Sequence, residues 1–142
     1  MNALLDQFLV ESRDALHDIG EALMRLEREE AGADEMTALF RLVHTLKGNS
    51  GLFTFPEMTR LLHAGEDLLD AVRHGEFPFT RAMADLLLET TDVLGRLCDD
   101  IEHDGTIHAD RSAAALRGAA ALRALLDAAQ QLQAGIPRRG IA

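Results

Sequence analysis

The sequence predicts an all-α protein, an antiparallel up-down-up-down four-helix bundle with an additional fifth helix at the carboxyl-terminal end. Its composition is 47% hydrophobic and 4% aromatic, with no Trp or Tyr and three Pro, which favours helix over sheet. Apolar residues recur at steps of three and four through most of the chain, as they do along the buried face of a helix. Only short breaks separate these stretches, and short connections force neighbouring long helices to lie antiparallel.

The first helix is expected over residues 2–29, with Asn2 as a cap for its free amide groups. One polar residue, Ser12, interrupts an otherwise apolar face. That face consists of Leu5, Leu9, Leu16, Ile19, Leu23 and Leu26. A short break is expected at 29–33, where Gly32 disfavours continuation of the helix.

The second helix is expected to begin at a cap on Asp34 and to end near 51–55. Its buried face consists of Met36, Leu39, Phe40, Val43, Leu46 and Ser50. Pro56 opens the third helix, because a proline at the first helical position loses no hydrogen bond, and Gly75 ends it. The buried face of the third helix consists of Met58, Leu61, Leu62, Gly65, Leu68, Leu69 and Val72.

A stiff turn at 77–79 leads to the fourth helix, for which Thr80 is the expected cap and Gly105 part of the closing break. Its buried face consists of Met83, Leu86, Leu87, Thr90, Leu94, Leu97 and Ile101. The fifth helix, residues 110–133, is rich in Ala and is expected to pack at the margin of the bundle. Its thinner apolar face consists of Leu116, Leu122, Leu126 and Leu132. We therefore expect one domain over residues 1–134, followed by a tail or the start of a linker at 135–142.

The charge and the cysteine content restrict the possible partners and the compartment. With 24 acidic and 14 basic residues, the formal net charge is −10, which disfavours binding to nucleic acid or to an acidic membrane surface. A protein partner is the better expectation. The single cysteine, Cys98, cannot form an internal disulfide, and neither an export signal nor a membrane span is recognisable. These features predict a cytoplasmic location, and we expect the isolated domain to be a monomer.

His44 is the candidate reactive residue of the second helix. It lies off the apolar face, so its ring is expected to be at least partly exposed. Lys47 and Gly48 follow one turn later, and Gly51 another turn on. A glycine within a helix costs about 1 kcal/mol relative to Ala, so Gly48 and Gly51 indicate a surface kept clear for a phosphate or a partner. Arg41, one turn before His44, is expected to be a solvated charge or a docking residue.

The hairpin formed by the second and third helices brings further groups to His44. If its turn is centred near residue 55, His44 and Glu66 are equidistant from the centre, as are Lys47 and His63. Antiparallel helices place such residues at the same level. The arithmetic therefore predicts a surface cluster of His44, Lys47, His63 and Glu66.

Such a cluster suits reversible phosphoryl transfer to a nitrogen nucleophile. A carboxylate that accepts the Nδ1 proton of His44 fixes the tautomer, leaves the Nε2 lone pair free and stabilises the imidazolium as the phosphoryl group arrives. Lys47 would offset the charge of the phosphoryl oxygens. The sequence has no phosphate-binding glycine loop, so the ATP chemistry is expected to lie in another domain.

The stretch 40–55, which reads FRLVHTLKGNSGLFTF, and the stretch 62–70, which reads LHAGEDLLD, resemble the amino-terminal phosphotransfer domain of chemotaxis histidine kinases of the CheA type. The resemblance implies that His44 is the phosphoacceptor, that Glu66 and His63 form hydrogen bonds around it, and that Lys47 assists transfer. It further implies no bound cofactor: the phosphoryl group comes from ATP on a separate kinase domain and passes to an aspartate of a response regulator receiver domain of the CheY or CheB type.

Three positions depart from the usual pattern, and none of them removes a proposed functional group. Thr45 stands where Ser is usual, Asn49 where a second glycine is usual, and Pro56 where a small polar residue is commoner. The other domains of a full kinase do not occur in these 142 residues. The chain is therefore expected to have no kinase activity of its own, and to be the phosphoacceptor part of a sensor kinase or a stand-alone carrier of a multistep phosphorelay.

Two other classes of protein are weighed against a phosphoryl carrier. A metal-carboxylate helical bundle would carry Glu three residues before His, and no glutamate in the sequence has that spacing. A purely structural scaffold would account for the apolar faces but leaves the grouping of His44, Lys47 and Gly48 without a reason.

Overall fold

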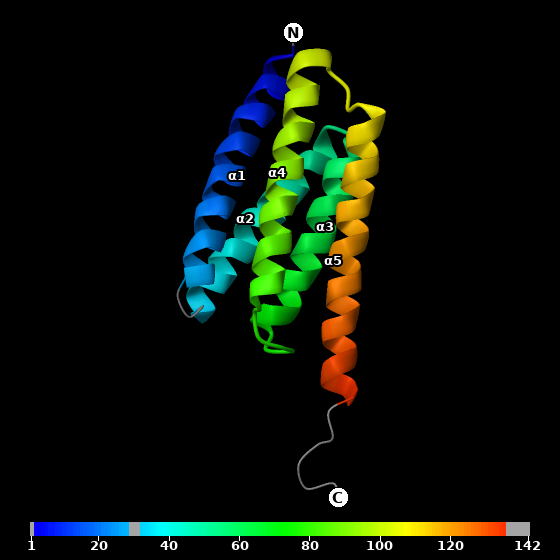
Figure 1. Cartoon of the computed structure of the whole chain (residues 1–142). Helices are drawn as coiled ribbons and strands as arrows, with labels where there is room; N and C mark the ends of the chain where they lie inside the picture. The colour runs from blue at the N-terminus through cyan, green and yellow to red at the C-terminus, as the bar shows by residue number, and fades with distance from the viewer. Residues whose placement is uncertain (1, 29–31, 136–142) are drawn as a thin grey trace, which may run out of the picture.

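The computed structural model describes residues 2–28 and 32–135, and within these ranges the chain folds into five α-helices (Figure 1). The helices are α1 (Ala3–Arg28), α2 (Ala33–Leu52), α3 (Pro56–Arg73), α4 (Arg81–Asp104) and α5 (Ala109–Gly135). The first four run alternately down and up, and α5 packs on the outside against α3 and α4. The predicted fold class, four antiparallel helices with an added fifth, is confirmed.

The ends of the helices follow from local hydrogen bonding. The side chain of Asn2 accepts bonds from the amides of Leu4 and Leu5, and that of Thr80 accepts one from Met83, as predicted for caps. The predicted cap on Asp34 is wrong. The cap lies two residues earlier, at Gly32, and the helix begins at Ala33, because the Glu35 carboxylate accepts a bond of 2.7 Å from the Gly32 amide.

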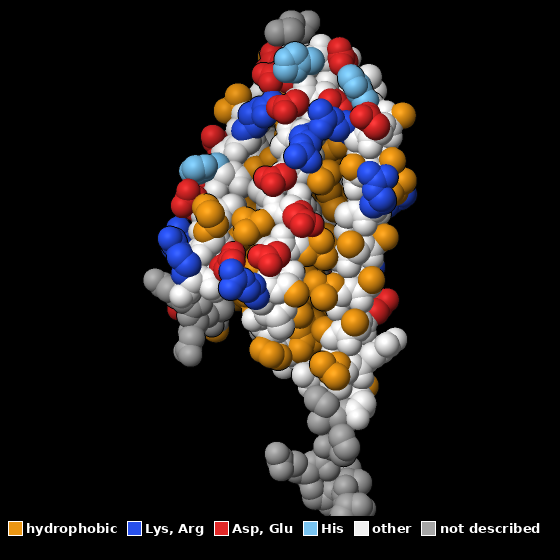
Figure 2. Space-filling model, viewed as in Figure 1, with side chains coloured by type: hydrophobic (Ala, Val, Ile, Leu, Met, Phe, Trp, Pro, Cys, Tyr) orange, Lys and Arg blue, Asp and Glu red, His pale blue; other side chains and the backbone are white. Residues whose placement is uncertain are grey.

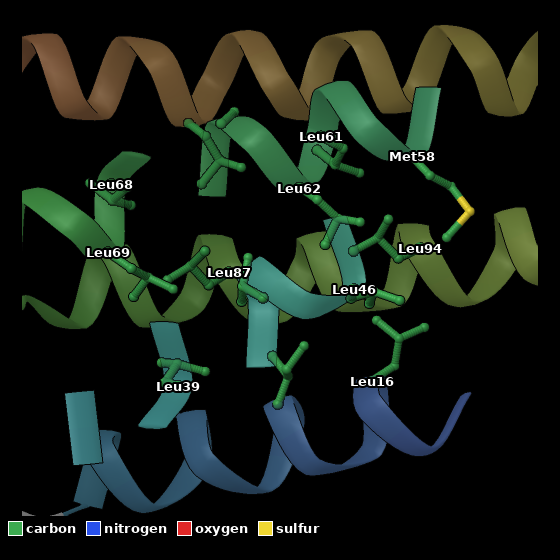
Figure 3. Packing of buried hydrophobic residues seen from close by; sticks show 14 of the residues in the cluster. Leu16, Leu39, Leu46, Met58, Leu61, Leu62, Leu68, Leu69, Leu87 and Leu94 are labelled. Atoms are coloured by element: carbon green, nitrogen blue, oxygen red, sulfur yellow. The ribbon is translucent and has the colours of Figure 1, made fainter. Parts of the chain in front are cut away.

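Leucine side chains from the first four helices meet in a single core. In Figure 3, the labelled leucines of α1, α2, α3 and α4 gather in the space between these helices. Several leucines of the core are completely shielded from solvent, among them Leu23, Leu61, Leu68, Leu69 and Leu97. Cys98 is also fully buried, and burial raises the pKa of its thiol to about 11. It is a core residue, as predicted.

The buried face of α5 differs from the prediction. Leu122 and Leu126 are buried as expected, but Leu116 is 45% exposed and Leu132 is 67% exposed. Two alanines, Ala115 and Ala119, take their place against the bundle. Hydrophobic side chains also line the seam between α4 and α5 in Figure 2.

Two further expectations concern the ends of the chain and membranes. Gly135, the first residue of the predicted tail, still belongs to α5, and the rest of that tail, 136–142, lies outside the described residues, as do 29–31 of the predicted break. None of the helices in the described part of the chain is long and apolar enough to cross a membrane.

Candidate functional site

His44 lies on the outer face of α2 with 61% of its side chain exposed, as its position off the apolar face predicts. Its Nδ1 atom is 2.6 Å from Oε2 of Glu66 on α3. An ionised carboxylate can only accept a hydrogen bond, so Nδ1 of His44 carries a proton and donates a hydrogen bond to Glu66. In the neutral imidazole, the other ring nitrogen, Nε2, then carries no proton and has its lone pair available for attack.

Glu66 is the buried member of the site, with 10% of its side chain exposed. Each carboxylate oxygen has one partner, because Lys47 Nζ donates to Oε1 at 2.8 Å while His44 bonds to Oε2. Burial raises the pKa of this carboxyl group, but the hydrogen bonds from Lys47 and His44 outweigh that effect and bring the pKa below its ordinary value. Glu66 therefore remains an acceptor through the neutral pH range.

A polar contact near the hairpin fixes the register that aligns these residues. The Ser50 hydroxyl is fully buried, donates to the carbonyl of Lys47 at 2.8 Å and is hydrogen bonded to the Thr59 hydroxyl at 2.9 Å. Phe53 and Phe55 of the connecting turn stack against Phe8 of α1. The turn is thereby held between three helices, so α2 and α3 cannot slide past each other without losing these contacts.

Contrary to the prediction, His63 does not join the cluster of His44, Lys47 and Glu66. Its Nε2 atom lies 3.4 Å from Oδ2 of Asp67, one turn further along α3, and Asp67 in turn accepts a bond from Arg123 of α5. Among the described residues, no hydrogen bond connects His63 to His44, Lys47 or Glu66. The reason is azimuthal: Asp67 and His63 share the side of α3 that turns toward α5, whereas Glu66 faces α2.

The residues expected to admit a partner are all exposed. A Cβ atom placed on Gly48 or Gly51 would meet no atom of the domain within 4 Å, so packing inside the domain does not require glycine at either position. Arg41 is also exposed, and no hydrogen bond or ion pair connects it to another residue in the described ranges. These three positions leave the surface along α2 open from one side of His44 to the other.

One neighbour of His44 is not predicted in this role. The apolar spacing of the second helix assigns Phe40 to the core, but the structure places it at the edge, half-buried, with its ring stacked on that of His44. The guanidinium carbon of Arg73 lies 4.3 Å from the centre of the Phe40 ring. The spacing of four residues between Phe40 and His44 is the signal that could have identified the first contact.

The described residues contain no group of three or more His, Cys, Asp or Glu side chains that could hold a metal ion. What the site does contain is an exposed imidazole, a buried carboxylate that orients it and a lysine that holds the carboxylate ionised. Chemically, this arrangement provides, in the neutral imidazole, a nitrogen nucleophile on the exposed outer face of α2, where a large partner can reach it.

Comparison with known proteins places this geometry in a family. The model of the Hpt domain matches residues 3–94. The chemotaxis protein CheA of Halobacterium salinarum is 34% identical over 110 residues, covering 78% of this chain and 16% of that protein. CheA of Listeria innocua is 30% identical over 135 residues, covering 95% of this chain and 21% of that protein. The chain thus spans at most about a fifth of these relatives.

A solved structure, the phosphorylated P1 domain of CheA3 in complex with CheY6 from R. sphaeroides, matches with a TM-score of 0.80 and 25% identity over 91% of this chain and 99% of that chain. The family match ends within α4. The structural match extends further. It leaves only 9% of the 142 residues uncovered, which is fewer residues than the 27 of α5, so the matched region includes part of α5. The predicted family is therefore confirmed, and the chain belongs to the Hpt domain family.

Proposed function

We propose that this chain is the phosphoryl carrier of a chemotaxis two-component system and that His44 is its phosphoacceptor. The observation that carries the proposal is the hydrogen bond between His44 Nδ1 and the ionised Glu66, which leaves Nε2 as the nucleophile on an exposed ring. The family membership and the relatives named CheA support the signalling context.

The transfer consists of two displacements at phosphorus. In the first, the Nε2 lone pair of His44 attacks the γ-phosphorus of ATP, the bond to the bridging oxygen breaks, and ADP leaves. The Nδ1 proton stays in its bond to Glu66, whose negative charge stabilises the imidazolium that forms. In the second, an aspartate oxygen of the receiver domain attacks the same phosphorus, and the nitrogen–phosphorus bond breaks to restore neutral His44.

Lys47 interacts with both the Glu66 carboxylate and the incoming phosphoryl group. Its ammonium group is 2.8 Å from Oε1 of Glu66 and keeps the carboxylate ionised and aligned. The Lys47 side chain is 24% exposed and lies one helical turn from His44. One of the three N–H groups of its ammonium can therefore donate a hydrogen bond to an oxygen of a phosphoryl group on Nε2. We propose that Lys47 assists transfer by this contact while still bound to Glu66.

We propose that the kinase domain and the receiver domain both approach His44 over the open surface along α2. Gly48 and Gly51 admit the close backbone contact that transfer between two active sites requires, and Arg41 offers an exposed positive charge to a docking partner. His63 has no assigned catalytic contact in this scheme. It lies near Asp67, which accepts a hydrogen bond from Arg123 and so links α3 to α5.

The remaining parts of the system lie outside this chain. We propose that ATP is bound by the kinase domain of a longer CheA-type protein, and that a receiver domain of the CheY or CheB type takes the phosphoryl group, in the cytoplasm. The complex with CheY6 described for the R. sphaeroides domain supports a receiver as partner. We expect residues 1–134 to act as a monomer. A stand-alone carrier of a phosphorelay is the alternative.

Replacement of the phosphoacceptor tests the proposal. The variant His44→Gln should take up no acid-labile label from ATP and a CheA-type kinase domain, while its circular dichroism stays that of the wild type because the side chain lies off the core. The matched control is His17→Gln, a change at an exposed histidine of α1, which should label normally. Labelling of His44→Gln at the wild-type level would refute the assignment.

A further inference from the structure

We propose that Phe40 is a positioning residue for His44: its ring sets the plane of the imidazole, and Arg73 holds the Phe40 ring in place. This inference rests on the proposed function, because it concerns the direction in which Nε2 presents the phosphoryl group. It adds two residues, one from α2 and one from α3, to a site otherwise formed by His44, Lys47 and Glu66.

The contact between the two rings follows from helix geometry. Phe40 and His44 are one turn apart on α2, and long side chains in a helix lean toward its amino-terminal end, so the His44 ring comes to lie beside that of Phe40. The ring centres are 5.9 Å apart and the planes differ by 16°. Nearly parallel rings at this separation are in offset stacking, the preferred arrangement for such pairs.

The stacking supplies a restraint that the hydrogen bond alone does not. The bond from Nδ1 to Glu66 Oε2 fixes one atom of the ring at 2.6 Å, but the ring can still turn about the line through these two atoms. A flat neighbour parallel to the ring opposes that rotation. Because a phosphorus bonded to Nε2 lies in the imidazole plane, fixing the plane fixes the line along which both displacements occur.

Arg73 links this wall to the other helix of the hairpin. Its guanidinium lies over the Phe40 ring, with the central carbon 4.3 Å from the ring centre, a cation–π contact. The same guanidinium forms an ion pair of 3.0 Å with Asp70, one turn earlier on α3. Arg73 is thus held by Asp70 of its own helix and in turn holds Phe40 of the neighbouring helix. The plane of the His44 ring and its hydrogen bond to Glu66 are therefore both fixed by contacts between α2 and α3.

The kinetic test compares two substitutions at one position. Phe40→Leu retains the apolar bulk and removes the flat ring, whereas Phe40→Tyr retains the ring. With ATP and a CheA-type kinase domain, we expect Phe40→Leu to lower kcat of labelling by about threefold to tenfold, the factor that an aromatic pair energy corresponds to. The KM for the kinase domain should not change, and Phe40→Tyr should restore kcat.

The matched control is Phe79→Leu, a change at another half-buried phenylalanine, on the turn before α4. It should lose a similar amount of thermal stability and label at the wild-type rate. Nuclear magnetic resonance gives a readout that does not depend on labelling. In Phe40→Leu the His44 ring protons should lose the ring-current shift of the stacked phenyl ring and show faster ring motion, while the Nδ1 proton remains bonded to Glu66.

The inference is overturned if Phe40→Leu labels with the wild-type kcat, or if Phe40→Tyr is as slow as Phe40→Leu. Unchanged His44 ring motion in Phe40→Leu would overturn it as well. Failure of the proposed function has a different signature, because the wild-type chain would then take up no label or the His44→Gln variant would keep it.

Discussion

Replacement of Gly48 by alanine should make the domain more stable and a poorer phosphoryl donor at the same time. Gly48 lies inside α2, and a Cβ atom there meets nothing within 4 Å. Alanine therefore fits without strain and contributes its better helix propensity, about 0.5–1 kcal/mol. For a domain of this size, that corresponds to a rise of roughly 2–4 °C in the melting temperature.

The loss of function comes from the partner and not from the fold. Gly48 follows His44 by one turn on the same exposed face, where in the proposed transfer a receiver domain must come within bonding distance of Nε2. A methyl group inserted into a tightly packed contact costs about 1–3 kcal/mol, which corresponds to a transfer rate roughly fivefold to a hundredfold lower. Single-turnover transfer from the labelled domain to a CheY-type receiver measures this rate, and a thermal melt measures the stability.

The matched control is Gly95→Ala. Gly95 also lies within a helix with no atom near its Cβ position, but it belongs to α4. It should give the same rise in melting temperature without any change in transfer. If Gly48→Ala transfers as fast as Gly95→Ala, the glycine does not serve partner approach; if it melts below the wild type, the open space at this position is refuted.

Three further predictions concern the orienting carboxylate and the fifth helix. Glu66→Gln should slow labelling of His44 by about tenfold or more, because the imidazole loses its orienting charge, while the dissociation constant for the receiver, measured by calorimetry, stays the same. The lowered pKa of Glu66 means that its stabilising contribution is complete above the ordinary value of 4.5, falls as the pH drops below 4.5 and is lost once the pH has passed the lower folded-state pKa; the difference in melting temperature between wild type and Glu66→Gln should therefore be constant from neutral pH down to about 4.5 and shrink below it. Leu122→Ala, a change at a fully buried side chain of α5, should lower the free energy of unfolding by about 2–5 kcal/mol, whereas Leu116→Ala should change it by less than about 0.5 kcal/mol; equal losses in urea titrations would contradict the observed face of α5.

The first four helices could be predicted from the sequence because their leucines leave only one face to bury. In α3, for example, Leu61, Leu68 and Leu69 occupy that face without competition and are all fully buried. The fifth helix was different. Leu116 and Leu122 are six residues apart, which places them roughly 240° apart around a helix, so both cannot face the bundle. Alanine can lie on either face of a helix, so the leucine spacing alone does not show which face of α5 is buried. That face is decided by how α5 fits against α3 and α4.

The candidate site shows what distance along a hairpin can and cannot predict. Equal separation from the turn places His44 and Glu66 at the same level, and the structure joins them at 2.6 Å. The same arithmetic pairs Lys47 with His63, yet Lys47 binds Glu66 and His63 lies beside Asp67. Level is a property of the hairpin, whereas the direction of a side chain depends on its angle around the helix and on a third element, here α5, which draws Asp67 away through Arg123.

The charges of the site explain why the proposed phosphoryl group would be carried and not retained. Before transfer, the negative charge of Glu66 is balanced by Lys47, to which it is bonded at 2.8 Å. A phosphoryl group on His44 brings about two negative charges and, through the imidazolium, one positive charge. Lys47 is then shared between a carboxylate and the phosphoryl oxygens, so neither receives its full interaction. A site with several converging cations would hold the group, whereas this one leaves it in excess of its compensating charge, so a partner site that offers more positive charge would draw it away.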